Sequence, residues 1–241
     1  MKVKSMESGS GESQYQELYE RLMEAQKLAI GLGAEWRLFE DGRPAEERRL
    51  ADPAQEKLRR AYEALYSLAD GKDYYLVTTV TDGAVYDTAF DGKRVTAPCG
   101  NIHWRQCSKA CTKDIWEEGE VPSDICPHCG TPMTGNTIQA ETYIEEGYLP
   151  GWTAYKTWQG SALNRRLLML ELGAGLDSPT VIRWPFERIA FLNQKAYLFR
   201  VHENLSQLPK DIQRAGRREE NSLDWVLGFA AYCAGKDKRG L

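Results

Sequence analysis

The chain has 241 residues, of which 42% are hydrophobic and 27% are charged, which is the composition of an ordinary globular protein. This composition excludes wholesale disorder, a collagen-like chain and a small disulfide scaffold. Lys and Arg number 31 against 35 Asp and Glu, and the formal net charge of −4 has the wrong sign for binding a phosphate backbone. We therefore expect no nucleic-acid partner.

Apolar runs in the sequence are too short to cross a bilayer, which takes roughly 20 residues. The segment 167–175 is interrupted by Glu171. Residues 1–14 are polar, lack the apolar core of a signal peptide and are predicted to form a disordered tail. We therefore expect no membrane association and a cytoplasmic location.

The first part of the chain predicts helices that alternate with strands. Apolar residues from Tyr15 to Leu28 recur at helical spacing, and a short apolar strand followed by Gly31 and Gly33 comes next. A second amphipathic helix is predicted over 53–69, and the β-branched and aromatic run 74–80 is typical of a buried strand. This strand-helix-strand order predicts a parallel sheet, and nucleotide-binding folds begin in the same order.

Residues 101–149 are polar and cysteine-bearing, and we predict that they form an inserted module. After Pro150 the alternating pattern returns: a helix near 152–166, a strand over 167–175, a proline-containing segment over 182–193, a strand over 196–201 and a closing helix over 223–234. The charged run from Arg214 is predicted to be a solvated loop. The predicted architecture is an α/β Rossmann-like parallel sheet built from 15–100 and 150–241.

Four cysteines fall within the insertion in two pairs. Cys107 and Cys111 are separated from Cys126 and Cys129 by 14 residues, and two such pairs can converge on one tetrahedral metal ion. Zinc suits four thiolates best, and because no position is left for water we expect a structural role. Buried free thiols and an iron-sulfur cluster are the alternatives.

Four segments resemble the sirtuin family, and specifically its macrodomain-linked class. VTTVTDGAVYDTAF (77–90) is similar to the family's Thr-Thr-Asn-Val-Asp strand and turn, and CGNIHWRQCSKAC (99–111) is similar to the catalytic strand that leads into the first zinc knuckle. LLMLELGAGLDSPTVIRWPFE (167–187) resembles the second glycine loop with its Pro-Phe segment, and LFRVHEN (198–204) resembles the ribose-contacting strand. The resemblance covers roughly residues 27–235.

The resemblance implies a Rossmann-like sheet with a zinc-ribbon insertion and NAD bound in the cleft between them. The residues that it places at the cofactor are Gly31, Gly33, Thr78, Asp82, Gly173, Gly175 and His202. Glycines let backbone amides approach phosphates, although turn glycines without a ligand are the alternative. Asp82 would face the nicotinamide amide or, with Gly83, simply form a turn.

The sequence also departs from the family pattern. After Gly33 and Ala34 the chain continues as Glu35-Trp36-Arg37, and the family's Pro-Asp-Phe-Arg motif is missing. Two asparagine positions are held by Val80 and His202. The position of the catalytic histidine is Cys99, which acts as a base or nucleophile only if its pKa is lowered and is otherwise an inert buried residue.

Two functions remain open from the sequence. The first is a divergent sirtuin that cleaves NAD to transfer ADP-ribose to a protein or to deacylate lysine, with Cys99 and Asp82 as catalytic residues and an acylated or lipoyl-carrier protein as substrate. The second is a catalytically inactive relative that binds a nucleotide or a protein. The retained glycines favour the enzyme, whereas the missing first-loop motif favours the binding module.

Overall fold

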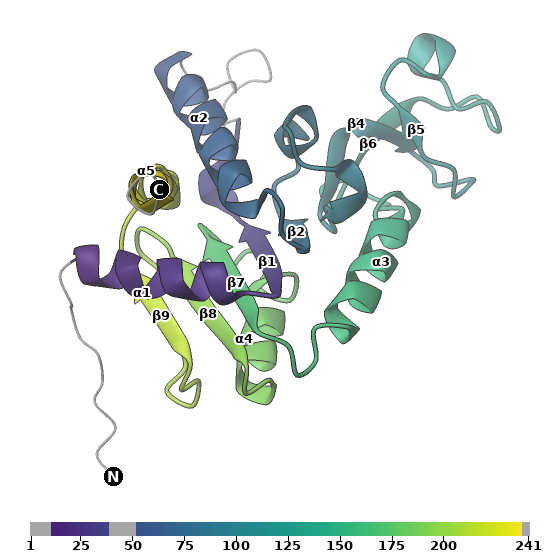
Figure 1. Cartoon of the computed structure of the whole chain (residues 1–241). Coiled ribbons are helices and arrows are strands. Elements are labelled where there is room, and N and C mark those ends of the chain that lie inside the picture. The colour runs from purple at the N-terminus through teal and green to yellow at the C-terminus, as the bar shows by residue number, and fades with distance from the viewer. Residues whose placement is uncertain (1–10, 39–51, 238–241) are drawn as a thin grey trace.

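The computed structural model describes residues 11–38 and 52–237. Its centre is a six-stranded sheet in the order β3-β2-β1-β7-β8-β9, in which every neighbouring pair is parallel (Figure 1). The strands are β1 (Lys27–Leu32), β2 (Tyr74–Thr78), β3 (Val95–Thr96), β7 (Leu167–Leu172), β8 (Ala196–Val201) and β9 (Ala215–Arg218). The predicted α/β class with a parallel sheet is confirmed.

The strand order reverses at β1. From β1 the chain builds outward through β2 and β3, and it later returns to the other side of β1 with β7, β8 and β9. Lys27 of β1 pairs with Leu167 of β7, and the Gly33 amide donates to the Leu172 carbonyl at 2.9 Å just beyond the strand ends. Ligands of open parallel sheets bind at such a switch point, outside the carboxyl ends of the strands.

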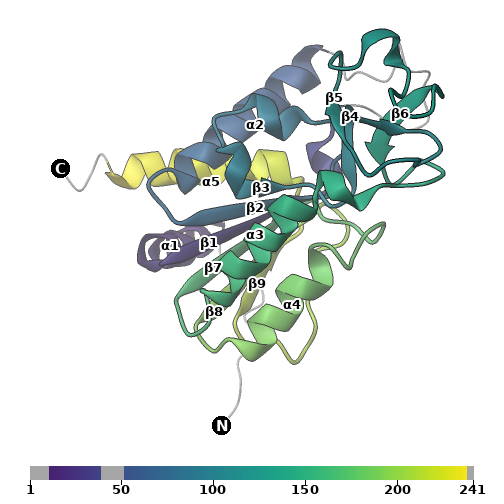
Figure 2. The same ribbon diagram turned by 90° about the vertical axis from the view of Figure 1, so that its right-hand side faces the viewer.

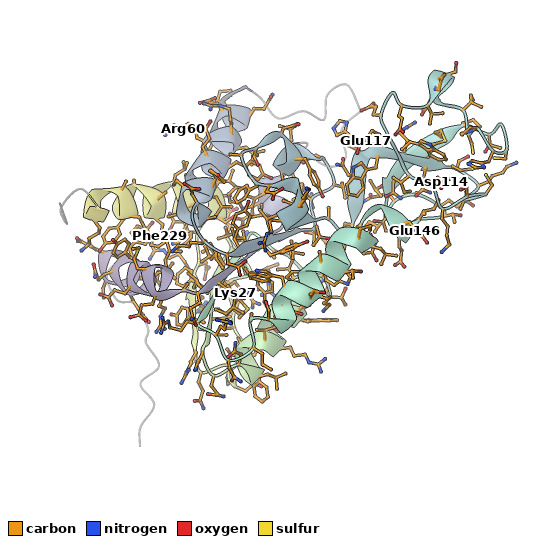
Figure 3. All side chains as sticks on the ribbon, turned by 45° about the vertical axis from the view of Figure 1, so that its right-hand side comes forward. Lys27, Arg60, Asp114, Glu117, Glu146 and Phe229 are labelled. Carbon is orange, nitrogen blue, oxygen red and sulfur yellow. The ribbon has the colours of Figure 1, made fainter. Side chains whose placement is uncertain are left out.

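Helices cover both faces of the sheet (Figure 2). The helices α1 (Gly11–Glu24), α2 (Asp52–Ala69) and α5 (Ser222–Asp237) pack on one face, and α3 (Leu149–Gly160) and α4 (Arg183–Leu192) pack on the other. Successive side chains of a strand point to opposite faces, so Leu28 and Ile30 join the first core and Ala29 joins the second. Phe229 of α5, labelled in Figure 3, is fully buried in the first core.

A small module lies beside the sheet, within the predicted insertion. Its three strands, β4 (Gly100–Cys107), β5 (Trp116–Glu117) and β6 (Met133–Thr137), form an antiparallel sheet in the order β5-β4-β6. Figure 3 shows Asp114 and Glu117 in this module and Glu146 where the chain approaches α3. Short 3-10 turns also occur in the described residues: η1 (Ala34–Trp36), η3 (Ala84–Asp87), η4 (Gly92–Arg94), η5 (Pro122–Asp124) and η6 (Glu145–Gly147).

Several predicted boundaries need correction. The helix α1 begins at Gly11, so residues 11–14 belong to it and not to a disordered tail, while residues 1–10 lie outside the described part of the chain. It ends at Glu24, because Leu28 is already in β1. Gly31 lies inside β1 and does not follow it. The strand β7 ends at Leu172, and α3 begins and ends a few residues earlier than predicted.

Two segments adopt regular structure that the sequence pattern did not predict. The proline-containing segment 182–193 forms α4, because Pro185 lies in the first helical turn, where its missing N–H removes no helical hydrogen bond. The charged run after Arg214 is not a loop, because residues 215–218 form β9 and pair with β8. This strand lies at the edge of the sheet, where polar side chains reach water. Of the helices in the two described ranges, none has the length and apolar character of a membrane span.

Candidate functional site

The structure brings together the four cysteines of the predicted metal site. Cys107 ends β4 and Cys111 follows it in a turn, while Cys126 and Cys129 lie in the turn before β6. All four Sγ atoms lie within 4.8 Å of one another, with Cys107–Cys129 at 3.5 Å and Cys111–Cys126 at 3.6 Å. Four thiolates around zinc at about 2.3 Å would stand roughly 3.8 Å apart. The cluster therefore fits a tetrahedral ion and is consistent with a zinc ribbon.

The module around the cluster has almost no apolar core of its own. Its buried apolar cluster consists of Cys107, Cys126 and Met133, with Trp116 and Val121 packed against them. The two nearby histidines lie outside this group of four and face carboxylates. His103 Nδ1 lies 2.6 Å from a Glu118 oxygen, and His128 Nε2 lies 3.0 Å from an Asp114 oxygen.

The two glycine loops meet at the switch point and pack on each other. A Cβ placed on Gly33 would lie 2.3 Å from the Ala174 Cα, and one on Gly31 would lie 2.5 Å from Ile182 Cγ2. Gly173 has a φ of +64°, which favours glycine. Packing and backbone conformation within the protein thus explain why glycine stands at these three positions, without reference to a ligand. Gly175 differs, because its nearest neighbour would be an Asp177 oxygen at 3.9 Å.

Between these loops lies an acidic side chain that the sequence analysis did not single out as a site residue. The Glu35 carboxylate accepts hydrogen bonds from the backbone amides of Glu203 at 2.8 Å and Ser222 at 2.6 Å. Its side chain is 10% exposed and covers Gly173, since a Cβ there would lie 2.5 Å from the Glu35 Cβ. The departure from the family pattern after Gly33 is the signal that could have identified it.

His202 lies next to this carboxylate. Its Nδ1 accepts hydrogen bonds from the amides of Asn204 and Leu205, both at 3.1 Å, and lies 3.4 Å from a Glu35 oxygen. Nδ1 therefore carries no proton in this arrangement, and burial lowers the pKa of the imidazole below its ordinary value. The neutral ring holds the turn that follows β8.

Thr78 and Asp82 hold the loop that follows β2. The Thr78 hydroxyl donates to the Leu32 carbonyl at 3.3 Å. The buried Asp82 carboxylate accepts from the amides of Ala84 at 2.9 Å and Leu38 at 2.5 Å, so it ties this loop to the segment after η1. Burial raises the pKa of Asp82, and the two amide donors oppose that rise.

Cys99 lies between β3 and β4, where the chain passes from the large sheet into the small module. Its side chain is 3% exposed, and its Sγ lies 3.6 Å from the Ser178 hydroxyl in the loop after β7. Burial raises the pKa of the thiol, with the Ser178 contact acting in the opposite direction. Cys99 and Asp82, the two predicted catalytic residues, have no hydrogen-bond partner in common among the described residues. Ser178 is a second site residue that the sequence analysis did not identify.

A separate cavity of about 330 Å³ opens where β3, the small module and the start of α3 meet. It is lined by Tyr86, Gly92, Lys93, Val95, Thr96, Ala97, Trp104, Gly147, Tyr148, Pro150, Gly151 and Ala154. None of the predicted site residues, all of which the structure describes, lines this cavity. It is therefore distinct from the loops that meet around Glu35.

Comparisons of the sequence with known proteins give distant relatives. No protein-family profile matches the chain. Over 172 residues, 64% of the chain, it is 26% identical to a protein ADP-ribosyltransferase of Staphylococcus aureus and covers 55% of that protein. Over 141 residues it is 23% identical to a probable bifunctional ADP-ribose hydrolase/ADP-ribosyltransferase of Fusarium oxysporum f. sp. cubense, of which it covers 23%. The chain thus spans about half or less of these relatives.

Comparisons of the structure give matches over nearly the whole chain. A Sir2 homologue in complex with NAD has a TM-score of 0.58 at 12% identity, covering 92% of this chain and 94% of the other. A Sir2 mutant in complex with a p53 peptide and NAD has the same TM-score at 16% identity, covering 93% and 98%. The chain therefore has the fold of the Sir2 homologues, and its sequence is similar to proteins named for ADP-ribosyl transfer, in agreement with the sirtuin resemblance of its sequence.

Proposed function

We propose that the chain binds NAD at the switch point of the sheet, in a crevice bordered by the β1 and β7 loops, and transfers ADP-ribose to a protein. The observation that carries this proposal is the convergence of the Glu203 and Ser222 amides on one negative group at the switch point of the sheet. Ser222 begins α5, a helix of 16 residues, and helix N-termini favour anions such as a pyrophosphate.

The comparisons support the same reaction class. A solved structure with this fold holds NAD, and the Staphylococcus relative is named for protein ADP-ribosyl transfer. The p53 peptide bound to another Sir2 structure favours a protein as the second substrate. For this chain we propose an acylated or lipoyl-carrier protein. Lysine deacylation is the other reaction that the fold supports.

In the proposed transfer, the bond between C1′ of the ribose and the nicotinamide nitrogen breaks. Nicotinamide leaves with the electron pair of that bond, and a nucleophilic atom of the acceptor protein forms a new bond to C1′. The proton of the acceptor goes to solvent or to a base. Asp82 is the carboxylate that we place toward the nicotinamide, and its buried position gives it a fixed orientation.

One observation favours the second candidate, a nucleotide-binding module without activity. The sequence resemblance puts Cys99 at the position of the family's catalytic histidine, but its thiol is buried and its pKa is raised, so it is protonated at neutral pH. A protonated thiol does not accept the acceptor's proton. If turnover occurs, we expect Cys99 to form the floor of the crevice and not to act as the base.

We also propose that the four-cysteine cluster holds one zinc ion with a structural role. The donor set is entirely thiolate, which selects zinc over hard cations such as Mg²⁺ and Ca²⁺. With all four positions filled by protein, no coordination site is left for water or substrate.

The test is nicotinamide release from NAD, followed by chromatography, with a lipoylated carrier domain or an acetyl-lysine peptide as acceptor. Release that depends on the carrier and leaves ADP-ribose on it supports transfer, whereas loss of the acetyl group supports deacylation. Cys99→Ala should retain the wild-type rate and Asp82→Asn should lose at least tenfold. Binding of ADP-ribose without nicotinamide release would favour the inactive binding module.

A further inference from the structure

The anion site of the crevice is already filled by the protein itself. Both oxygens of Glu35 are in use, one on the Glu203 amide and the other on the Ser222 amide. The second of these amides opens α5, where the partial positive charge of the helix is concentrated. A carboxylate in this place makes the same kind of charge-assisted contacts that a phosphate oxygen would make.

The position of Glu35 is fixed by its neighbour. Trp36 is fully buried, stands edge-on to Tyr62 with ring centroids 4.9 Å apart, and donates from its indole nitrogen to the Ser222 hydroxyl at 3.1 Å. Its backbone amide donates to the Gly33 carbonyl at 3.0 Å, which closes η1. The backbone at Glu35 is therefore held against the start of α5, and only the Glu35 side chain can rotate away.

The Glu35 side chain also blocks the approach from the second glycine loop. Gly173 has no side chain of its own, and the Glu35 Cβ and Cγ occupy the space above it, 2.5 and 2.9 Å from the point where a Cβ on Gly173 would lie. A phosphate that approached the Ser222 amide across Gly173 would meet this side chain. It would also meet like charge, because Glu35 and a phosphate repel each other at short range.

We propose that Glu35 is an internal competitor for the anionic part of the nucleotide, so that binding requires its side chain to leave the Glu203 and Ser222 amides. This inference rests on the proposed function, because it concerns the same crevice. It makes Glu35 a determinant of affinity: the wild-type protein binds a pyrophosphate-containing ligand weakly, and removal of the carboxylate frees two preorganised donors.

The experiment is a calorimetric titration of the full chain with ADP-ribose and, separately, with inorganic pyrophosphate. The first variant is Glu35→Ala, which removes the carboxylate from the Glu203 and Ser222 amides. The second is Glu35→Gln, which keeps a side chain of similar size there without the negative charge. Asp211→Ala is the matched control, since it removes one exposed negative charge before β9, at the opposite end of that strand from Ser222, and leaves Glu35 and both amides in place. Urea unfolding of each variant establishes that it is folded. If Glu35→Ala does not fold, the comparison is made with Glu35→Gln.

We expect Glu35→Ala to bind ADP-ribose at least tenfold more tightly than the wild type, Glu35→Gln to gain less, and Asp211→Ala to stay within about threefold. Equal affinity of the folded Glu35 variants and the wild type would overturn the inference, even if the wild type releases nicotinamide. Tighter binding by Glu35→Ala without nicotinamide release from any protein would support the inference and contradict the transferase proposal.

Discussion

Glu35, Asp82 and His202 all direct their polar atoms at backbone amides of the protein. Glu35 and Asp82 each accept two N–H groups, and Nδ1 of His202 accepts two more. Hydrogen bonds to charged groups contribute about 1.5–3 kcal/mol each, which applies to Glu35 and Asp82, and those to the neutral His202 ring contribute less, about 0.5–1.5 kcal/mol. All three side chains therefore stabilise the loops around the proposed crevice. Substitution of any of them affects folding stability as well as binding, and the two effects need separate measurements.

The buried thiol of Cys99 leads to a prediction about pH. Because burial raises its pKa in the folded state, the stability that this group contributes is fully present below the pKa of the unfolded chain and is lost as the pH rises through the folded-state pKa. We expect the free energy of unfolding of wild type to fall more between pH 7 and pH 10 than that of Cys99→Ala. Urea unfolding at both pH values measures the difference.

Thiol labelling provides an independent check of the same prediction. At pH 8 and with metal bound, Cys99 should react with a disulfide reagent at least tenfold more slowly than a free peptide thiol, as located by mass spectrometry. Cys233, which is also buried, is the internal control. Rapid labelling of Cys99 alone would show that the thiol is accessible and would make it a candidate base again.

Some site residues could be predicted from the sequence around them, whereas others depend on partners that are distant in the chain. The four cysteines could be predicted because their spacing alone permits a shared ion. The sequence marked Glu35 only as part of a departure from the family pattern and did not mark Ser178 at all, because their partners, Ser222 and Cys99, lie far away in the chain and come close only through the sheet topology. The sequence likewise left Cys99 as either a catalytic thiol or an inert buried residue, and only the fold shows that it is buried.

At the level of elements, the packing of the β1 loop on the β7 loop predicts that alanine substitutions at Gly33 and Gly175 change the free energy of unfolding by very different amounts. A Cβ at Gly33 would lie 2.3 Å from backbone atoms of Gly173 and Ala174, which cannot move aside as a flexible side chain would. We expect Gly33→Ala to lower the free energy of unfolding by about 1–3 kcal/mol or more. Denaturant unfolding measures this loss.

Gly175→Ala is the matched substitution in the second loop. Its Cβ would have an Asp177 oxygen as nearest neighbour at 3.9 Å, and its φ is not positive. We expect a change within about 1 kcal/mol, in either direction, because the alanine restricts the unfolded chain without a clash. Equal destabilisation by both substitutions would mean that the loops do not pack as described.

Elements differed in how well the sequence predicted them. The strand β7 is buried on both faces, so its run LLMLEL, which is apolar except for Glu171, indicated a strand. The strand β9 has the sequence AGRR and lies at the sheet edge, where backbone pairing with β8 defines it and side-chain hydropathy does not. The helix α4 escaped prediction because Pro185 resembles a breaker until its place in the first turn is known.

For the molecule as a whole, the unequal cores of its two parts predict separate responses to metal removal. The small module buries three residues around the cluster, whereas the large sheet is covered by two extensive cores. We expect chelation or Cys126→Ser to release one zinc per chain and to unfold the module while the sheet stays folded. Hydrogen exchange should rise in residues 100–137 and stay slow in β1 and β7.

The control for this experiment is Cys99→Ser, which alters a buried cysteine outside the cluster and should retain one equivalent of zinc. Elemental analysis of protein purified without chelator gives the metal and its stoichiometry. Absence of zinc there, or the presence of iron with inorganic sulfide, would contradict the assignment.

The place of β1 in the sheet has a consequence for synthesis on the ribosome. Of the described strands, β1 is translated first, and β2 pairs with one of its edges soon afterwards. The strand that pairs with its other edge, β7, is translated only after the whole cysteine module. During that interval the β7-facing edge of β1 stays unpaired and its apolar side chains are partly uncovered, a state that invites aggregation. Rapid closure of the module around the proposed zinc ion would bring β7 into reach and shorten this exposure.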